Sequence, residues 1–276
     1  MKKRILRYPP PEIIPLIKLL RSRGKCLKRN ISVVSTLPAE SILIIAPHPD
    51  DEAIGMGGTL GMHLDVQSQV TVLYMTDGRY EISKNGLSTI DMINVRRKEA
   101  ESIGEKYHIN QLFWKVEDTC LANDDDTISE MIKVLKDIRP KIIYLPSFFD
   151  YHYDHFTANR ILAEALKKTS SSLINIIGYE VRDNIHYPNY VVDISTHFER
   201  KKEILSHYAT PLKVRDYIKL CKYRNMLYYA LYINREIEGY AEAFCCLDSE
   251  TYQNVYNDYL YALREFGSNL PLHIMV

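Results

Sequence analysis

Residues 41–52 have the sequence SILIIAPHPDDE, an apolar run followed at once by a histidine and three carboxylates. The first part carries no charge and is rich in isoleucine, which is typical of a strand buried on both faces of a sheet. The polar part then falls at the carboxyl end of that strand. Ligands of open parallel sheets bind at this edge, so the stretch predicts both a core strand and the location of the chemistry.

The segments that follow alternate between helical and strand-like patterns. Helices are expected over residues 53–65, 91–103, 127–138 and 156–168, and strands over 70–75, 111–114, 141–145 and 173–179. This alternation is typical of parallel strands covered by helices. We therefore predict an α/β fold: a Rossmann-like, doubly wound, mostly parallel sheet with helices on both faces.

The two ends of the chain depart from this pattern. Residues 1–40 are broken by prolines and carry clustered Lys and Arg, so we expect an N-terminal extension with a short helix over 13–20. A single domain is expected over 41–276. Beyond residue 196 the pattern becomes helical and tyrosine-rich, with most tyrosines packing at half-buried surfaces. Lys201 and Lys202 are expected on a solvated helix face, with contact to an anionic group of the substrate as the alternative.

The composition argues against several classes of protein. Lys+Arg and Asp+Glu number 35 each, which gives no reason to expect nucleic acid or an anionic membrane as a partner. Five cysteines without CxxC spacing favour reduced thiols over disulfides or a cysteine metal site. No signal peptide or long apolar run is visible, so we expect a cytoplasmic protein without a transmembrane segment.

A second polar segment, residues 150–155 (DYHYDH), follows the strand expected over 141–145. The carboxyl ends of parallel strands share one edge, so this segment can meet residues 47–52 although the two are far apart in sequence. Imidazole and carboxylate are good zinc ligands, and a catalytic zinc keeps three of them plus water. An acidic first helical turn explains the acids but not His48 or the second segment. Together the segments predict a divalent-metal site.

A nucleotide cofactor is the rival use of this edge, because Gly55-Met56-Gly57-Gly58 follows the strand. A lone glycine cluster is a weak signal. Three carboxylates also occupy the turn, where a pyrophosphate needs backbone amides and no negative charge. We reject the nucleotide, and expect the glycines to let the helix pack close to the sheet.

These residues resemble the LmbE-like (PIG-L) family of zinc-dependent N-deacetylases. Its signature is an apolar strand leading into (A/P)HPDDE, matched later by HPDH. The first motif is complete at Pro47–Glu52, and the second has Tyr153 in place of proline. Weaker agreement comes from Thr76–Gly78, Arg96–Ala100 and Gly239–Phe244. The resemblance therefore extends over about residues 41 to 245.

The resemblance implies a role for each site residue. His48, Asp51 and His155 bind one Zn²⁺, although ferrous iron suits the same ligands. Asp50 is implied as the general base, and His152 as the general acid that also supports the oxyanion. Asp154 is implied to orient or tune His152. Arg96 resembles an arginine that contacts substrate in the family. Tyr151, beside the acid, is a further expected substrate contact, with packing in the wall of the site as an equal alternative.

The implied reaction removes the acetyl group from an N-acetylated sugar, such as an N-acetylglucosamine glycoconjugate or polysaccharide precursor. An amide nitrogen leaves poorly, so an acid opposite the base is what this chemistry requires. Two alternatives stay open: a zinc hydrolase of an ester or non-sugar amide, and a non-catalytic metal-stabilised binding protein. The presence of both Asp50 and His152 speaks against the second.

Overall fold

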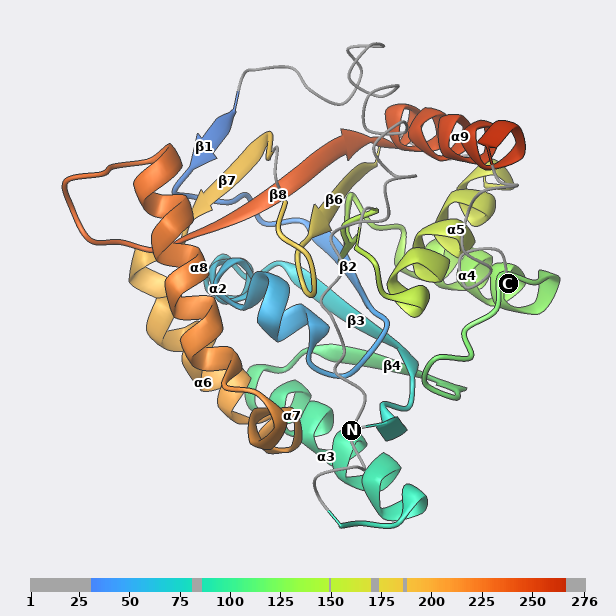
Figure 1. The fold of residues 1–276 in the computed structure, drawn as a ribbon, viewed down its shortest axis with the longest axis horizontal. Helices are drawn as coiled ribbons and strands as arrows, with labels where there is room; N and C mark the ends of the chain where they lie inside the picture. The colour runs from blue at the N-terminus through green and yellow to red at the C-terminus, as the bar shows by residue number, and fades with distance from the viewer. Residues whose placement is uncertain (1–30, 81–85, 149, 170–173, 186–187, 267–276) are drawn as a thin grey trace.

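The computed structural model describes residues 31–80, 86–148, 150–169, 174–185 and 188–266. The strands are β1 (Ser32–Val34), β2 (Ser41–Ala46), β3 (Gln69–Thr76), β4 (Asn110–Val116), β5 (Ile142–Pro146), β6 (Asn175–Tyr179), β7 (Tyr190–Asp193) and β8 (Ala241–Asp248). They form one sheet in the order β1-β7-β8-β6-β5-β2-β3-β4 (Figure 1). All neighbours are parallel except β8, which runs antiparallel to β6 and β7.

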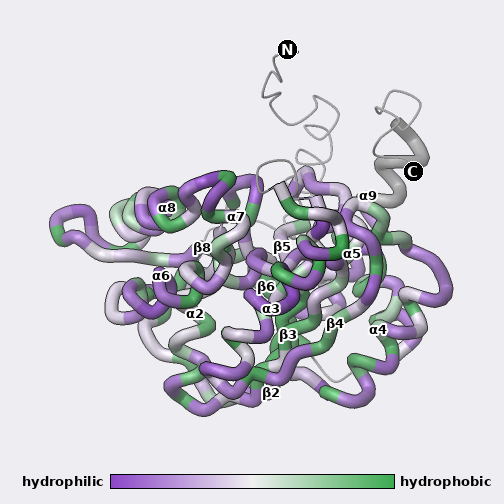
Figure 2. Tube along the Cα trace, turned by 90° about the horizontal axis from the view of Figure 1, so that it is seen from below, coloured by the Kyte–Doolittle hydropathy of each residue, from purple (hydrophilic) through white to green (hydrophobic). Residues whose placement is uncertain are grey.

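Helices cover both faces of this sheet, so the predicted α/β class is confirmed (Figure 1). They are α2 (Asp51–Asp65), α3 (Thr89–Tyr107), α4 (Asp125–Ile138), α5 (Tyr153–Lys167), α6 (Phe198–Ser206), α7 (Ala209–Val214), α8 (Tyr217–Tyr232) and α9 (Ser249–Phe266), with a 3₁₀ turn, η2 (Ser195–His197), before α6. Figure 2 shows the apolar stretches gathered along the central strands, with polar stretches in the peripheral loops. Among the described residues, no helix is long and apolar enough to cross a membrane.

Strand β2 lies at the centre and contributes to two separate cores. Ile42 and Ile44 pack into the core shared with α2 and α6, whereas Leu43 and Ile45 pack into the core shared with α4 and α5. All four side chains are fully buried. Successive residues of a strand point to opposite faces, so a continuous apolar run is what a strand covered on both sides requires.

Helix α2, which follows β2, is kinked at Met56 (φ −144°, ψ 23°). A kink frees backbone amides that a straight helix pairs internally. Glu242 of β8 accepts hydrogen bonds from the freed amides of Gly58 (3.0 Å) and Thr59 (2.7 Å). Its carboxylate therefore caps the second half of α2, which is how the motif at residues 239–244 supports the helix that carries the first motif.

The partner of Glu242 is Lys201 of α6, which is fully buried. The Lys201 ammonium also donates to the carbonyl oxygen of Ile54, at 3.0 Å. The expectation that Lys201 lies on a solvated helix face was wrong. In the protein interior the Lys201 ammonium neutralises the buried Glu242 carboxylate and donates a hydrogen bond to the Ile54 carbonyl near the kink.

The glycines of α2 allow close packing, as expected. A Cβ on Gly55 would lie 2.2 Å from the Tyr179 ring of β6, and one on Gly58 would lie 2.6 Å from Ile194. Since real Cβ atoms do not approach this closely, α2 packs against β6 and the start of η2 only because side chains are absent there.

The C-terminal third differs from its prediction. Residues 241–248 form strand β8 rather than a helix, and β7 was also missed. The first four residues of β8 are all buried, so they show no period-2 alternation, and their partners β6 and β7 come much earlier in the sequence. Neither local pattern nor a hairpin turn marks this strand.

The N-terminal predictions are tested only in part. The helix expected over residues 13–20 lies outside the described residues. Within the expected extension, β1 pairs in parallel with β7 at the edge of the sheet. The division into an extension over 1–40 and a domain over 41–276 stays a prediction. The described cysteines are all free thiols, namely Cys120, Cys221, Cys245 and Cys246.

A buried neutral histidine predicts an acid-sensitive core. His63 of α2 is fully buried, with ring nitrogens 3.2 Å from Ser68 Oγ and 3.0 Å from Tyr144 Oη. Burial lowers its pKa to about 4, whereas an unfolded histidine titrates near about 6.5. Between these values the unfolded state binds the proton first, so the free energy of unfolding should fall as pH falls.

The expected contribution of His63 is as much as about 3 kcal/mol, fully present above pH ~6.5 and lost by pH ~4. Urea unfolding at several pH values measures it. In His63→Gln the decline across this window should be shallower than in the parent protein. An identical decline in both proteins would contradict the assignment.

Candidate metal centre

The two motif segments meet at one edge of the sheet. Strand β2 leads into residues 47–50 and then α2, and β5 leads through a loop into α5. Strands β2 and β5 are parallel neighbours, with Ile44 opposite Tyr144. Their carboxyl ends therefore lie side by side, and the predicted meeting of the two segments is confirmed by the contacts below.

The three expected metal ligands converge on one point. His48 Nδ1, Asp51 Oδ2 and His155 Nε2 lie 3.2 Å from one another in all three pairings. A tetrahedral zinc ion about 2.0 Å from each nitrogen and oxygen ligand separates those ligand atoms by about 3.3 Å. The donor set and its spacing therefore fit a small divalent ion.

Each candidate imidazole ligand has a carboxylate at its other nitrogen. His48 Nε2 lies 3.0 Å from Asp154 Oδ2 and 3.1 Å from Asp118 Oδ1. His155 Nδ1 lies 3.1 Å from Asp150 Oδ1. Metal-binding histidines typically use this second nitrogen to fix the ring and its tautomer. The arrangement supports a ligand role for both histidines.

Carboxylates make this position favourable for positive charge. Burial lowers the pKa of His155, but the charges of Asp51 and Asp150 outweigh it and raise the pKa to about 9. Burial also opposes the charged form of His48, yet Asp51, Asp118 and Asp154 hold the pKa of its ring well above the usual value. A divalent cation supplies the positive charge that these carboxylates stabilise.

Asp154 supports His48 in this structure. Besides its contact with His48, its carboxylate accepts hydrogen bonds from the backbone amides of Thr119 (2.7 Å) and Leu121 (3.2 Å). Its link to His152 runs through the backbone, because the Asp154 amide donates to His152 Nδ1 at 3.3 Å. The charge of the Asp154 carboxylate nevertheless acts to raise the pKa of the His152 ring, against the larger effects that lower it, and a role in orienting or tuning His152 stays a prediction.

His152 stands beside the converging ligands. Its ring centre lies 4.6 Å from that of His48 and 4.8 Å from that of His155. Asp150 Oδ1 accepts the His152 backbone amide at 3.0 Å and so fixes the residue. Burial and then the charges of His48 and His155 lower the pKa of its ring to about 3.

Asp50 occupies a conformation that is rare for a residue with a side chain, with φ 125° and ψ −21°. Outliers of this kind cluster at functional sites, where the surroundings hold them in place. Here the Asp50 carbonyl oxygen accepts the amide of Ile54 (2.9 Å), and its own amide donates to Glu52 Oε2 (3.3 Å). The carboxylate lies 3.3 Å from Arg96, outside the group of three ligand atoms.

Glu52, the last residue of the first motif, is a buried support for this turn. Oε1 accepts hydrogen bonds from the hydroxyls of Tyr208 and, at 3.2 Å, Tyr74. Burial raises the pKa of Glu52 to about 7. Tyr208 is itself 1% exposed, so this C-terminal tyrosine is a core residue and not the half-buried one expected.

Arg96 is 2% exposed, and its contacts include three residues of the protein. It donates to the carbonyl oxygen of Pro49, and lies 3.3 Å from Asp50 and 3.4 Å from Glu99. These contacts hold the turn that carries Asp50. Tyr151, in contrast, is 59% exposed beside His152. A substrate contact for either residue stays a prediction.

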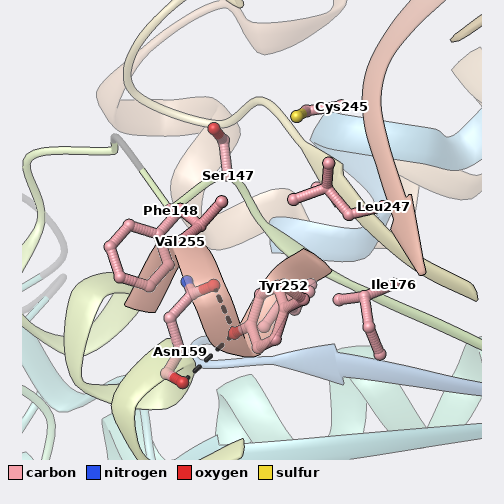
Figure 3. Close-up of a pocket in the computed structure, with 10 residues that line it drawn as sticks. Ser147, Phe148, Asn159, Ile176, Cys245, Leu247, Tyr252 and Val255 are labelled. Carbon is pink, nitrogen blue, oxygen red and sulfur yellow. Dashed lines mark hydrogen bonds between the residues drawn. The ribbon is translucent and has the colours of Figure 1, made fainter. Parts of the chain in front are cut away.

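Helix α9 lines a small, mostly apolar cavity through Tyr252 and Val255, and it supports the second motif by hydrogen bonds (Figure 3). The Tyr252 hydroxyl donates to Asn159 Oδ1 at 2.8 Å, and Asn159 Nδ2 donates to the carbonyl oxygens of His155 (2.8 Å) and Pro146 (3.0 Å). The chain of contacts ties the end of β5 and the first turn of α5 together, and so fixes the backbone at His155.

Sequence reasoning assigned no role to Asp118 or Asp150. Asp118 follows β4 by two residues, and the rule that placed the motifs at the ligand edge of the sheet applies equally to it. Asp150 opens the second polar segment and was quoted only as part of it. Its two neighbours in space, His152 and His155, were both singled out.

Known proteins match the part of the chain that carries this site. A family model described as PIG-L, GlcNAc-PI de-N-acetylase, matches residues 43–166, which include both motif segments. Diacetylchitobiose deacetylase of Thermococcus kodakarensis is 31% identical to the chain over 181 residues. The chain belongs to the PIG-L, or LmbE-like, family. That alignment covers 59% of this PIG-L chain and 66% of the relative, and curated relatives in general are matched over about half to two thirds of their length.

Two solved structures share the fold of this PIG-L protein. N,N'-diacetylchitobiose deacetylase from Pyrococcus horikoshii superposes with a TM-score of 0.65 at 24% identity, covering 77% of this chain and 86% of that one. GalB, a 4-carboxy-2-hydroxymuconate hydratase from Pseudomonas putida, gives 0.64 at 18% identity, covering 76% and 96%. A deacetylase and a hydratase thus share the architecture, so function has to be argued from the site.

Proposed function

We propose that this PIG-L protein is a zinc-dependent hydrolase that removes the acetyl group from a sugar of the N-acetylglucosamine type. The observation that carries the proposal is the convergence of His48, Asp51 and His155 at 3.2 Å spacing beside a carboxylate and an imidazole outside that set. The Thermococcus relative, named for deacetylating diacetylchitobiose, supports the substrate class.

His48, Asp51 and His155 hold the ion, which when bound supplies a Lewis acid and a water of lowered pKa. Asp50 accepts the proton that the attacking water gives up. Its carboxylate is 3.3 Å from Arg96, and hydrogen bonds to Ile54 and Glu52 hold its backbone in place. A base held in one orientation accepts the proton without first reorganising.

His152 delivers a proton to the departing amine, a step worth roughly 10²–10⁴-fold in rate. Part of the lowering of its pKa comes from positive charge on the rings of His48 and His155, and these rings are neutral when they serve as metal ligands. The His152 backbone is fixed by Asp150, and its side chain is only partly buried, so it faces the space that a substrate enters. Acid and base therefore stand on different segments, Asp50 after β2 and His152 after β5, with the ligands between them.

Acetate release tests the proposal directly. Protein stripped with a chelator is expected to lose turnover of diacetylchitobiose, and addition of one equivalent of Zn²⁺ should restore it; an Fe²⁺ arm tests the metal. Full activity of the stripped protein would refute metal dependence. With metal bound, failure to release acetate from a panel of N-acetyl sugars would overturn the deacetylase assignment, and faster turnover of an ester or non-sugar amide would favour that alternative.

A further inference from the structure

Arg182 lies just past β6, at the same edge of the sheet as the two motifs. Its backbone amide donates to Asp150 Oδ2 at 2.9 Å. The other oxygen of Asp150 accepts the His152 amide and lies 3.1 Å from the His155 ring. One buried carboxylate therefore fixes the position of Arg182 relative to a candidate metal ligand and the candidate acid.

The side chain of Arg182 has no comparable anchor. The residue is exposed, and within the described part of the chain its guanidinium has no hydrogen-bond or ion-pair partner. Burial by surrounding atoms acts to lower the pKa of this guanidinium, but the charges of Tyr217, Asp51 and Asp50, followed by that of Tyr151, outweigh it and raise the pKa. The side chain therefore lies near the two aspartates of the first motif. The positive charge of Arg182 in turn helps to lower the pKa of the His152 ring. This combination places an accessible cation at the rim of the site.

Such a group is built to bind a ligand and not to hold the fold. Removing it leaves no buried donor or acceptor without a partner, because only its backbone is bonded. A guanidinium presents a planar set of donors that matches the two oxygens of a carboxylate or phosphate.

We propose that Arg182 is a specificity residue that binds a carboxylate or phosphate on the substituent attached to the N-acetyl sugar. This inference rests on the proposed deacetylase function and narrows it: the preferred substrates are anionic N-acetylglucosamine derivatives. Tyr151, exposed next to His152, lies close enough to Arg182 to share this rim.

The test compares three substrates of the metal-loaded protein: diacetylchitobiose, N-acetylglucosamine 1-phosphate, and an N-acetylglucosamine glycoside that carries a carboxylate. The parent protein should favour one or both anionic substrates. In Arg182→Ala the ratio of kcat/KM for the anionic over the neutral substrate should fall roughly tenfold to a hundredfold, through KM. Arg182→Lys keeps the charge but loses the planar donors, and should restore part of the ratio.

Lys133→Ala is the matched control, since it removes one exposed positive charge from α4. It should leave the ratio unchanged. Equal losses on neutral and anionic substrates in Arg182→Ala, or no preference in the parent protein, would overturn the proposal. Comparing the phosphate-bearing with the carboxylate-bearing substrate shows which of the two anionic groups Arg182 binds.

Calorimetric titration separates this inference from the proposed function. Glucosamine 1-phosphate should bind the parent protein more tightly than glucosamine, and Arg182→Ala should lose that difference. This result is obtained whether or not acetate is released. If the parent protein binds glucosamine 1-phosphate more tightly than glucosamine but deacetylates no substrate, the proposed function is wrong and the anion site is supported. If it deacetylates substrates but binds the two ligands equally well, the anion site is wrong.

Discussion

Asp50→Asn is expected to lower acetate release by roughly two to four orders of magnitude while leaving one metal ion per chain. Asparagine has nearly the shape of aspartate but cannot accept the proton of the attacking water. The Asp50 carboxylate lies outside the group formed by His48, Asp51 and His155, so metal binding should survive. Asparagine also tolerates the positive φ of this position better than most residues.

The neighbouring aspartate provides the matched control. Asp51 Oδ2 lies 3.2 Å from both His48 Nδ1 and His155 Nε2, so Asp51→Asn should lose metal as well as activity. Metal content by atomic emission and acetate release by an enzyme-coupled assay separate the two variants. If Asp50→Asn loses the ion and Asp51→Asn keeps it, the roles of the two aspartates are exchanged.

Lys201→Met is expected to lower the free energy of unfolding by about 3–5 kcal/mol. It removes the ammonium that pairs with Glu242 and leaves a carboxylate with 1% exposure uncompensated. The same change removes the donor to the Ile54 carbonyl at the kink of α2. Urea unfolding followed by circular dichroism measures the loss.

An exposed ion pair of the same type calibrates this result. Lys106 and Glu203 are each 45% exposed, so Lys106→Met should cost less than about 1 kcal/mol. Adding Glu242→Gln to Lys201→Met neutralises the stranded charge and keeps one acceptor oxygen for either the amide of Gly58 or that of Thr59, which bond to different oxygens of Glu242, so it should recover part of the stability. A loss in Lys201→Met no larger than that in Lys106→Met would contradict a role for the buried pair.

The strands and helices around the site could be predicted because their local patterns suffice. Strand β2 and its neighbours are buried on both faces, so Ile42 to Ile45 form an uninterrupted apolar run. The meeting of His48 and His155 could be predicted because parallel strands bring their carboxyl ends to one edge, which joins the two segments without knowledge of the loops. The helix after β2 was also placed closely, with its start at Asp51 and its end at Asp65.

What the sequence did not yield depends on contacts between distant segments. Strand β8 has no alternation and pairs with strands far away in sequence. Lys201 looks like any surface lysine until Glu242 is placed opposite it. The contact of Asp154 with His48 was not predicted, and the carboxylate that makes it also accepts the amides of Thr119 and Leu121. Arg182 carries no motif; it follows β6 at the edge of the sheet that carries the motifs, and its backbone bond to Asp150 could not be predicted from the sequence.

The way Arg182 is attached has a consequence for how relatives of this protein can diverge. The bond to Asp150 uses the backbone amide of residue 182, which every amino acid except proline supplies. Mutation at this one codon can therefore exchange the chemical group at the rim while Asp150 continues to hold His152 and His155 in place. The position is suited to rapid change of substrate preference, both in evolution and in a saturation library, where proline is the one residue expected to be lost with the catalytic geometry.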